Sequence, residues 1–179
     1  MLSVLMCWGC FTSYGWAAKN SDREFRAVWI TTVWNLDWPN KNDSPAMQQK
    51  ALLDILDKAT SLRLNAVMFQ IRPEGDALYQ STYEPWSSWL TGTQGKAPQP
   101  LWDPLSFAVN AGHERGLEVH AWLNPYRAGV ISTTQKARNH ISKTHPELVK
   151  EYGGSLYINP GADGSVEYIK MIAADIVSR

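Results

Sequence analysis

A histidine, a tryptophan and an asparagine occupy alternate positions in the segment LEVHAWLNPYR at 117–127. Residues that alternate in this way lie on one face of a β-strand, and the segment NAVMFQIR at 65–72 places a glutamine and an arginine in the same way. Amide, guanidinium and imidazole groups beside an indole ring suit a ligand with many hydroxyl groups, such as a sugar. We therefore predict a substrate-binding set formed by Gln70, Arg72, His120, Trp122, Asn124, Tyr126 and Arg127.

Three of these side chains also have a structural interpretation. Trp122 could pack in the core with its indole N–H bonded, His120 could be a hydrogen-bonded structural histidine, and Arg72 could pair with Glu74 or Asp76. The other three histidines have the character of surface residues. The candidate catalytic carboxylates follow predicted strands without a spacing that pairs any two of them, and they are Asp37, Glu74 and Asp76. No metal-ligand spacing, phosphate-binding glycine loop or nucleophile elbow is present, so we expect no metal or other cofactor.

Three apolar, β-branched segments predict strands at 26–32, 65–72 and 117–124. Two helices are predicted to begin at a capping residue followed by proline, at Ser44-Pro45 and at Asp103-Pro104. A short extended piece at 155–159 precedes a third helix, whose apolar residues recur at helical spacing. Strand and helix thus occur three times in succession, which is typical of parallel βαβ units.

The loops predicted to leave the carboxyl ends of these strands are long, at 33–44, 73–103 and 125–163, and most of the tryptophans outside the strands lie in them. Ligands bind at this end of parallel α/β folds. One apolar and one polar face per strand suits a closed barrel, because an open sheet has helices on both faces. A (β/α)8 barrel typically needs about 250 residues. We therefore predict an α/β fold that is the incomplete, N-terminal portion of a TIM barrel, with about three βα units.

The charge balance and the first residues of the chain bear on its partners and its compartment. Lysine plus arginine equals aspartate plus glutamate, 17 against 17, which gives no argument for nucleic acid or an anionic membrane as a partner. Residues 1–18 carry no charged side chain and are interpreted as an export signal, with lipid attachment at Cys10 as the alternative. We expect a periplasmic or extracellular protein with one domain at 19–179 and no membrane-spanning segment in the mature chain.

Four ordered segments resemble the glycosyl-hydrolase-like 10 family, and they read FRAVWITTVWNLDWP, VMFQIRPEGDALYQSTYEPWSSWLTGTQG, WDPLSFAVNAGHERGLEVHAWLNPYR and YINPG. The resemblance runs from about Arg26 to Arg179 and implies an exported bacterial (β/α)8-barrel protein that acts on polysaccharide, including cell-wall glycan. Asn159 stands where the family commonly shows an aspartate, so we assign it no catalytic role. The resemblance also implies that the main catalytic carboxylates lie beyond Arg179.

The sequence therefore predicts a glycoside hydrolase-like protein with polysaccharide or cell-wall glycan as its partner, of which this chain is an inactive N-terminal fragment. Two other classes stay open. A non-catalytic glycan-binding barrel would keep the aromatic residues at the rim and lack the acids. A different barrel enzyme, such as an amidohydrolase with a metal at His120, would need further histidines at the strand ends.

Overall fold

The computed structural model describes residues 24–131 and 135–179, and the predicted export signal at 1–18 lies outside these ranges. Among the residues that the structure describes, no helix combines the length and the apolar composition that crossing a membrane requires.

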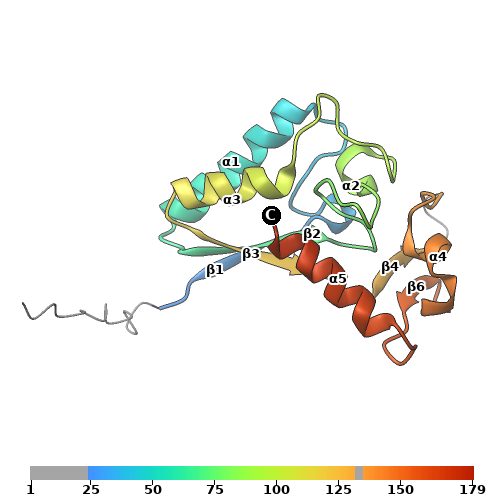
Figure 1. The fold of residues 1–179 in the computed structure, drawn as a ribbon. Coiled ribbons are helices and arrows are strands. Elements are labelled where there is room, and N and C mark those ends of the chain that lie inside the picture. The colour runs from blue at the N-terminus through green and yellow to red at the C-terminus, as the bar shows by residue number, and fades with distance from the viewer. Residues whose placement is uncertain (1–23, 132–134) are drawn as a thin grey trace, which may run out of the picture.

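The main sheet consists of three parallel strands in the order β1-β2-β3. They are β1 (Ala27–Ile30), β2 (Ala66–Arg72) and β3 (Glu118–Leu123). The helices α1 (Pro45–Ser61) and α3 (Pro104–Glu114) lie together over one face of this sheet (Figure 1). The predicted strands, their parallel direction and their order are confirmed.

Both helices begin where the sequence predicts. The Ser44 hydroxyl accepts a hydrogen bond from the backbone N–H of Met47 at 3.3 Å, and the Asp103 carboxylate accepts one from Ser106 at 3.0 Å. Each cap satisfies one of the N–H groups that lack a partner at a helix start. Capping and proline thus set the start of α1 and α3 locally, before any packing is considered.

Close packing between α3 and β3 depends on Gly112. A Cβ atom at this position would lie 2.4 Å from Cγ2 of Val119, so no larger residue fits without displacement.

The apolar face of the sheet packs under the helices through Val67, Phe69 and Ile71, which are at most 1% exposed. These residues have the helix-facing orientation that the alternation predicts.

The opposite face of the sheet carries the aromatic and polar row. Trp29 lies in register with Met68, and Met68 with His120. Trp122 follows two residues after His120 and lies in register with Gln70. Trp29 is 58% exposed, so this face is open along the described residues of β1 and β3.

A second, antiparallel sheet occupies the segment that the sequence analysis treats as a long loop at 125–163. Its strands are β4 (Arg127–Val130), β5 (Val149–Tyr152) and β6 (Ser155–Ile158), in the order β4-β6-β5. The predicted extended piece at 155–159 is therefore a strand, but in this separate sheet. Gly153 and Gly154, both with positive φ, connect β5 to β6, and a two-residue Gly-Gly link between extended segments is a hairpin signal that could have revealed it.

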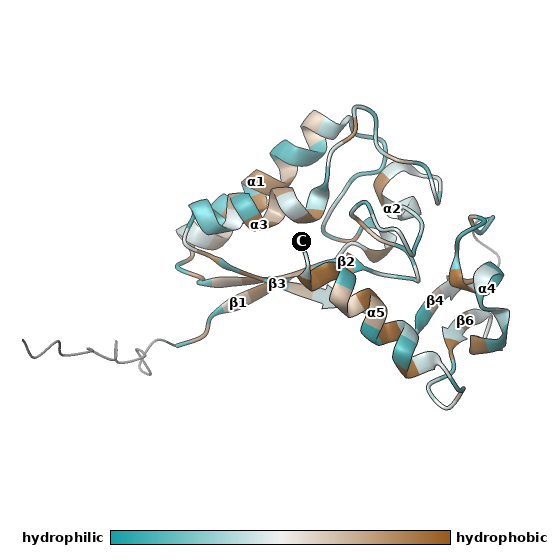
Figure 2. Cartoon of the chain, in the orientation of Figure 1, coloured by the Kyte–Doolittle hydropathy of each residue, from teal (hydrophilic) through white to brown (hydrophobic). Residues whose placement is uncertain are grey.

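The remaining elements are short, except for the last helix. They are η1 (Val33–Asn35), α2 (Ser88–Thr91), α4 (Ile141–Thr144), η2 (Pro146–Leu148) and α5 (Ser165–Val177). Helix α5 runs from the second sheet back toward the main sheet (Figure 1). Figure 2 shows hydrophobic and hydrophilic residues alternating along α1 and α5, the pattern of helices with one apolar face.

Candidate functional site

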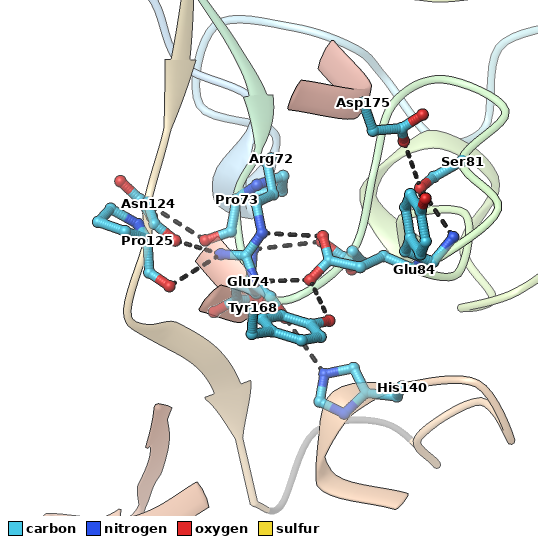
Figure 3. Close-up of polar contacts among 12 residues, drawn as sticks. Arg72, Pro73, Glu74, Ser81, Glu84, Asn124, Pro125, His140, Tyr168 and Asp175 are labelled. Carbon is cyan, nitrogen blue, oxygen red and sulfur yellow. Dashed lines mark hydrogen bonds and ion pairs between the residues drawn. The ribbon is translucent and has the colours of Figure 1, made fainter. Parts of the chain in front are cut away.

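Arg72, at the end of β2, forms a buried ion pair with Glu84 from the loop that follows (Figure 3). Its Nε donates to Oε2 of Glu84 at 2.8 Å and its Nη2 donates to Oε1 at 2.6 Å. The Tyr168 hydroxyl of α5 donates to the same Oε1 at 2.9 Å. Both charged side chains are 0% exposed. Arg72 therefore does not offer its guanidinium to a ligand, and its predicted pairing with Glu74 or Asp76 is wrong.

A β-bulge explains why Arg72 departs from the predicted alternation. Gln70 lies in register with Trp122, but Arg72 lies in register with Leu123, so Ile71 is an extra residue in β2. One inserted residue reverses the face on which the following side chain lies. Arg72 thus joins the helix-facing set together with Leu123, where Glu84 and Tyr168 are its partners.

The side chains of Trp122 and Asn124 hold each other at the end of β3. The indole Nε1 of Trp122 donates to Oδ1 of Asn124 at 2.9 Å, and Nδ2 of Asn124 donates to the backbone oxygen of Pro73 at 3.0 Å. The Trp122 ring meets Trp29 edge to face, with 4.8 Å between ring centroids. Asn124 therefore orients Trp122. Trp29 was missed as a member of this row, although the alternation in β1 places it there.

Gln70 and His120 have partners within the protein. Oε1 of Gln70 accepts hydrogen bonds from the backbone N–H groups of Thr32 at 2.8 Å and Val33 at 2.9 Å, so this buried side chain fixes the loop after β1. His120 is exposed, with Nε2 at 3.1 Å from the Glu118 carboxylate. Within residues 24–131 and 135–179, no three histidine, cysteine, aspartate or glutamate side chains gather as a metal site.

Glu74 is the centre of a cluster at the carboxyl end of β2. Its Oε1 accepts a hydrogen bond from Nε of Arg127 at 2.9 Å, and its Oε2 accepts one from the indole of Trp89 at 3.1 Å. The side chain of Glu74 is 7% exposed, whereas that of Arg127 is 30% exposed. In the part of the chain that the structure describes, Nη1 and Nη2 of Arg127 have no hydrogen-bond partner. The ion pair thus fixes Arg127 and leaves its terminal donors available.

The other two candidate carboxylates have different surroundings. Asp76 is buried and accepts hydrogen bonds from the backbone N–H of Glu74 at 3.2 Å and from Nε2 of Gln94 at 3.0 Å. Burial, with the neighbouring charge of Glu74, raises the pKa of Asp76 to about 6. Asp37 is exposed and accepts from the backbone N–H of Thr31 at 2.7 Å. The structure therefore brings Glu74 and Asp76 together, while the hydrogen bond from Thr31 holds Asp37 beside the end of β1.

His140 is buried behind Glu74, so its interpretation as a surface residue is wrong. Its Nδ1 accepts a hydrogen bond from the backbone N–H of Ser142 at 3.2 Å, which assigns the proton to Nε2. Nε2 lies 3.3 Å from the backbone oxygen of Glu74 (Figure 3). Burial lowers the pKa of His140 to about 4, so it is neutral at pH 7. His140 thereby fixes the backbone that carries Glu74.

Three tryptophans of the long loops make contacts of two kinds. Trp38 is 2% exposed, its indole donates to the backbone oxygen of Gln48 at 2.8 Å, and Trp102 packs against it at 6.0 Å between centroids. These two rings anchor loops to the core. Trp89 instead contacts Glu74. Tyr126, at the rim beside Arg127, is 41% exposed.

Sequence comparisons find relatives over nearly the whole described chain. The model of a protein family described as Glycosyl hydrolase-like 10 matches residues 24–179. The chain is 44% identical over 156 residues to Glycosyl hydrolase YngK of Bacillus subtilis (strain 168), and the aligned region covers 86% of this chain and 30% of that protein. It is 34% identical over 179 residues to Glycosyl hydrolase DigH of Escherichia coli (strain K12), and the aligned region covers 90% of this chain and 40% of that protein. The chain thus spans less than half the length of these two relatives.

Solved structures show a similar fold at low sequence identity. A hypothetical protein from Ruminiclostridium thermocellum superposes with a TM-score of 0.55 at 16% identity, covering 84% of this chain and 70% of that one. A GH36 alpha-galactosidase from Geobacillus stearothermophilus, solved in complex with stachyose, superposes with a TM-score of 0.53 at 12% identity, covering 88% of this chain and 20% of that one. At these identities the similarity concerns the fold alone.

Proposed function

The chain belongs to the glycosyl hydrolase-like 10 family, and from this premise we propose that it binds polysaccharide, including bacterial cell-wall glycan, at the carboxyl ends of β1, β2 and β3. The three βα units would form the N-terminal part of a (β/α)8 barrel. Support for the barrel comes from the parallel strands with helices over one face and from the fold shared with an alpha-galactosidase.

The environment of Arg127 is the observation that carries this proposal. A guanidinium group presents five N–H donors in a plane, and here one of them is held by Glu74 at 2.9 Å while the side chain remains 30% exposed. A donor group that is fixed in place loses little conformational entropy when it binds a ligand. Arg127 is therefore suited to the hydroxyl groups of a sugar, with Tyr126 exposed beside it.

Within the described residues, the three candidate carboxylates are poorly placed to act as an acid and base pair. Glycoside hydrolysis commonly uses two carboxyl groups that flank the scissile bond. Both oxygens of Glu74 accept hydrogen bonds, Asp76 is 1% exposed, and Asp37 bonds the end of β1. We assign these residues to positioning, and we propose that the chain by itself binds glycan without hydrolysing it.

Substitution of Arg127 tests the binding proposal. Arg127→Lys keeps the positive charge beside Glu74 but removes the planar set of donors. We expect the chain to bind sacculi purified from bacterial cell walls in a sedimentation assay, and the variant to bind about tenfold more weakly. Arg115→Lys is the matched control, because Arg115, the C-cap residue of α3, also donates through its Nε to a carboxylate, that of Asp57 on α1, at 2.6 Å. Equal binding by Arg127→Lys and the unmodified chain would refute the role of Arg127.

A sugar-release assay tests the second part of the proposal. The chain should release no reducing sugar from sacculi or from soluble polysaccharide. Release that disappears in Glu74→Gln would overturn the assignment of Glu74 to positioning and would make it a catalytic carboxylate.

We also propose export through residues 1–18, on the evidence of their composition alone. Cell fractionation with an antibody against the chain should find it outside the cytoplasm. A mass increase that is lost in Cys10→Ala would identify lipid attachment, whereas a mature chain shortened near Ala17 without lipid would identify an ordinary signal peptide.

A further inference from the structure

The second sheet carries a groove lined by tyrosines on the side that faces away from the core. The groove has a volume of about 520 Å3, and its lining includes Tyr126, Lys150, Tyr152, Tyr157, Asn159 and Pro160. Tyr152 is 81% exposed and Tyr126 is 41% exposed. Such an exposed set of aromatic rings on a small sheet points to a binding surface.

The strand register explains why these side chains share one face. Lys150 of β5 lies opposite Tyr157 of β6, and Tyr152 lies opposite Ser155. Ile158 and Leu156, which alternate with Tyr157 and Ser155, belong to the core or pack against it. The core thus fixes the sheet from one side, and Lys150, Tyr152 and Tyr157 share the other side. Tyr126, which precedes β4, and the buried Ile158 complete the lining of the groove at its edge.

This face continues into the candidate site through Arg127. Arg127 lies in register with Tyr157 across β4 and β6, and its Nε bonds Glu74 at the end of β2. A row therefore runs from Glu74 through Arg127 and Tyr157 to Lys150. A ligand held by the terminal nitrogens of Arg127 would enter the groove if it extended along this row.

We propose that the groove is a second subsite, which holds further sugar rings of the glycan chain bound at Arg127. The inference rests on the proposed function, since it takes the occupant of the groove to be part of the same glycan. The volume lies in the range of about 300–1,000 Å3 that is typical of small-molecule sites. Substrate selection follows from this arrangement: the protein favours long glycan chains over short ones.

The lining chemistry suits sugar rings. A tyrosine ring offers an apolar face for the C–H groups of a sugar, and its hydroxyl serves both as donor and as acceptor. Lys150 lines the groove and takes part in no ion pair within residues 24–131 and 135–179, so its ammonium group can donate to sugar oxygens. Aromatic faces with one polar donor at the edge are the combination expected for a polyhydroxylated ligand.

Calorimetric titration with two chitin oligomers, chitohexaose and chitobiose, tests the subsite on the full chain. Tyr152→Ala should weaken chitohexaose binding about tenfold and leave chitobiose binding unchanged. Tyr152→Phe keeps the ring and should bind chitohexaose within about twofold of the unmodified chain. Tyr83→Ala is the matched control, because Tyr83 is 42% exposed and lies outside the groove. Since Tyr152 is 81% exposed, its replacement leaves the core intact.

The outcomes separate this inference from the proposed function. If Arg127→Lys weakens the binding of both oligomers and Tyr152→Ala weakens neither, the subsite is refuted and the proposed function stands. If Tyr152→Ala weakens chitohexaose binding and Arg127→Lys has no effect, the groove binds glycan and the role of Arg127 is refuted. If the unmodified chain binds neither oligomer nor sacculi, both proposals are overturned.

Discussion

The guanidinium of Arg72 and the carboxylate of Glu84 form a two-point ion pair with no exposed side-chain surface, joining the end of β2 to the loop that follows it. The remaining nitrogen, Nη1, donates to the backbone oxygen of Asn124 at the end of β3. Tyr168 of α5 completes the environment of Glu84. This one pair therefore connects two strands of the main sheet, a long loop and the last helix.

We expect Glu84→Gln to lower the free energy of unfolding by about 3–5 kcal/mol, because it leaves a buried guanidinium without its counter-charge. Urea denaturation followed by circular dichroism measures the effect. The double substitution Arg72→Met with Glu84→Leu should cost less than Glu84→Gln alone, since no uncompensated charge remains. Glu118→Gln, which changes an exposed carboxylate, is the control. A loss below about 1 kcal/mol in Glu84→Gln, the range of exposed pairs, would show that the pair is solvated.

Trp122 is expected to stack a sugar ring, because its ring lies on the open face of the sheet and Asn124 fixes its indole N–H at 2.9 Å. Trp122→Ala should weaken chitohexaose binding about tenfold in calorimetry, and Trp122→Phe should weaken it less. Asn124→Leu should also weaken binding, since it releases the indole without removing it. Unchanged affinity in Trp122→Ala, with the circular dichroism spectrum preserved, would rule out stacking.

Asp76 and His140 are expected to give opposite dependences of stability on pH. The pKa of Asp76 is raised from 3.8 to about 6 in the folded protein, so the folded state binds more protons there, and its contribution to stability falls as pH rises from about 4 to 6. The pKa of His140 is lowered from 6.5 to about 4, so the unfolded state binds more protons, and its contribution rises as pH rises from about 4 to 6.5. Each slope reaches at most about 1.4 kcal/mol per pH unit.

Single substitutions should separate these two slopes in urea denaturation between pH 4 and 7. Compared with the unmodified chain, the free energy of unfolding of Asp76→Asn should rise more steeply with pH, because the falling contribution of Asp76 is removed. The free energy of unfolding of His140→Asn should instead fall with pH, because the rising contribution of His140 is removed. The side-chain oxygen of the asparagine in His140→Asn can still cap α4. Parallel pH profiles for all three proteins would contradict the assignment of these groups.

Gly112→Ala should destabilise the protein by about 1–3 kcal/mol, the usual cost of overpacking, because the added Cβ would lie 2.4 Å from Cγ2 of Val119. Adding Val119→Ala should recover part of that loss by making room. Thermal unfolding of the single and double variants checks this, with Ser106→Ala as an exposed control on the same helix. If the double variant is less stable than Gly112→Ala alone, the steric explanation fails.

Features that depend on neighbouring residues along the chain could be predicted from the residue pattern alone. Caps at Ser44 and Asp103, each followed by proline, set the helix starts because a capping side chain bonds N–H groups two or three residues ahead. The alternation of residue types predicted which side chains lie on each face of β1, of β2 as far as Gln70, and of β3, because the side-chain period of a strand is two. The parallel order of β1, β2 and β3 followed from the repeated strand-helix pattern, whereas the second sheet within 125–163 did not follow from it.

The identity of the buried partners depends instead on contacts between distant parts of the chain. A single extra residue at Ile71 reversed the direction of Arg72, and nothing in the local pattern of residue types marks a bulge. Glu84 and His140 reach Arg72 and Glu74 through loops without a regular period, so their burial depends on how those loops fold back. Long-range pairing of this kind is selected by packing and charge compensation in three dimensions, which residue spacing along the chain does not encode.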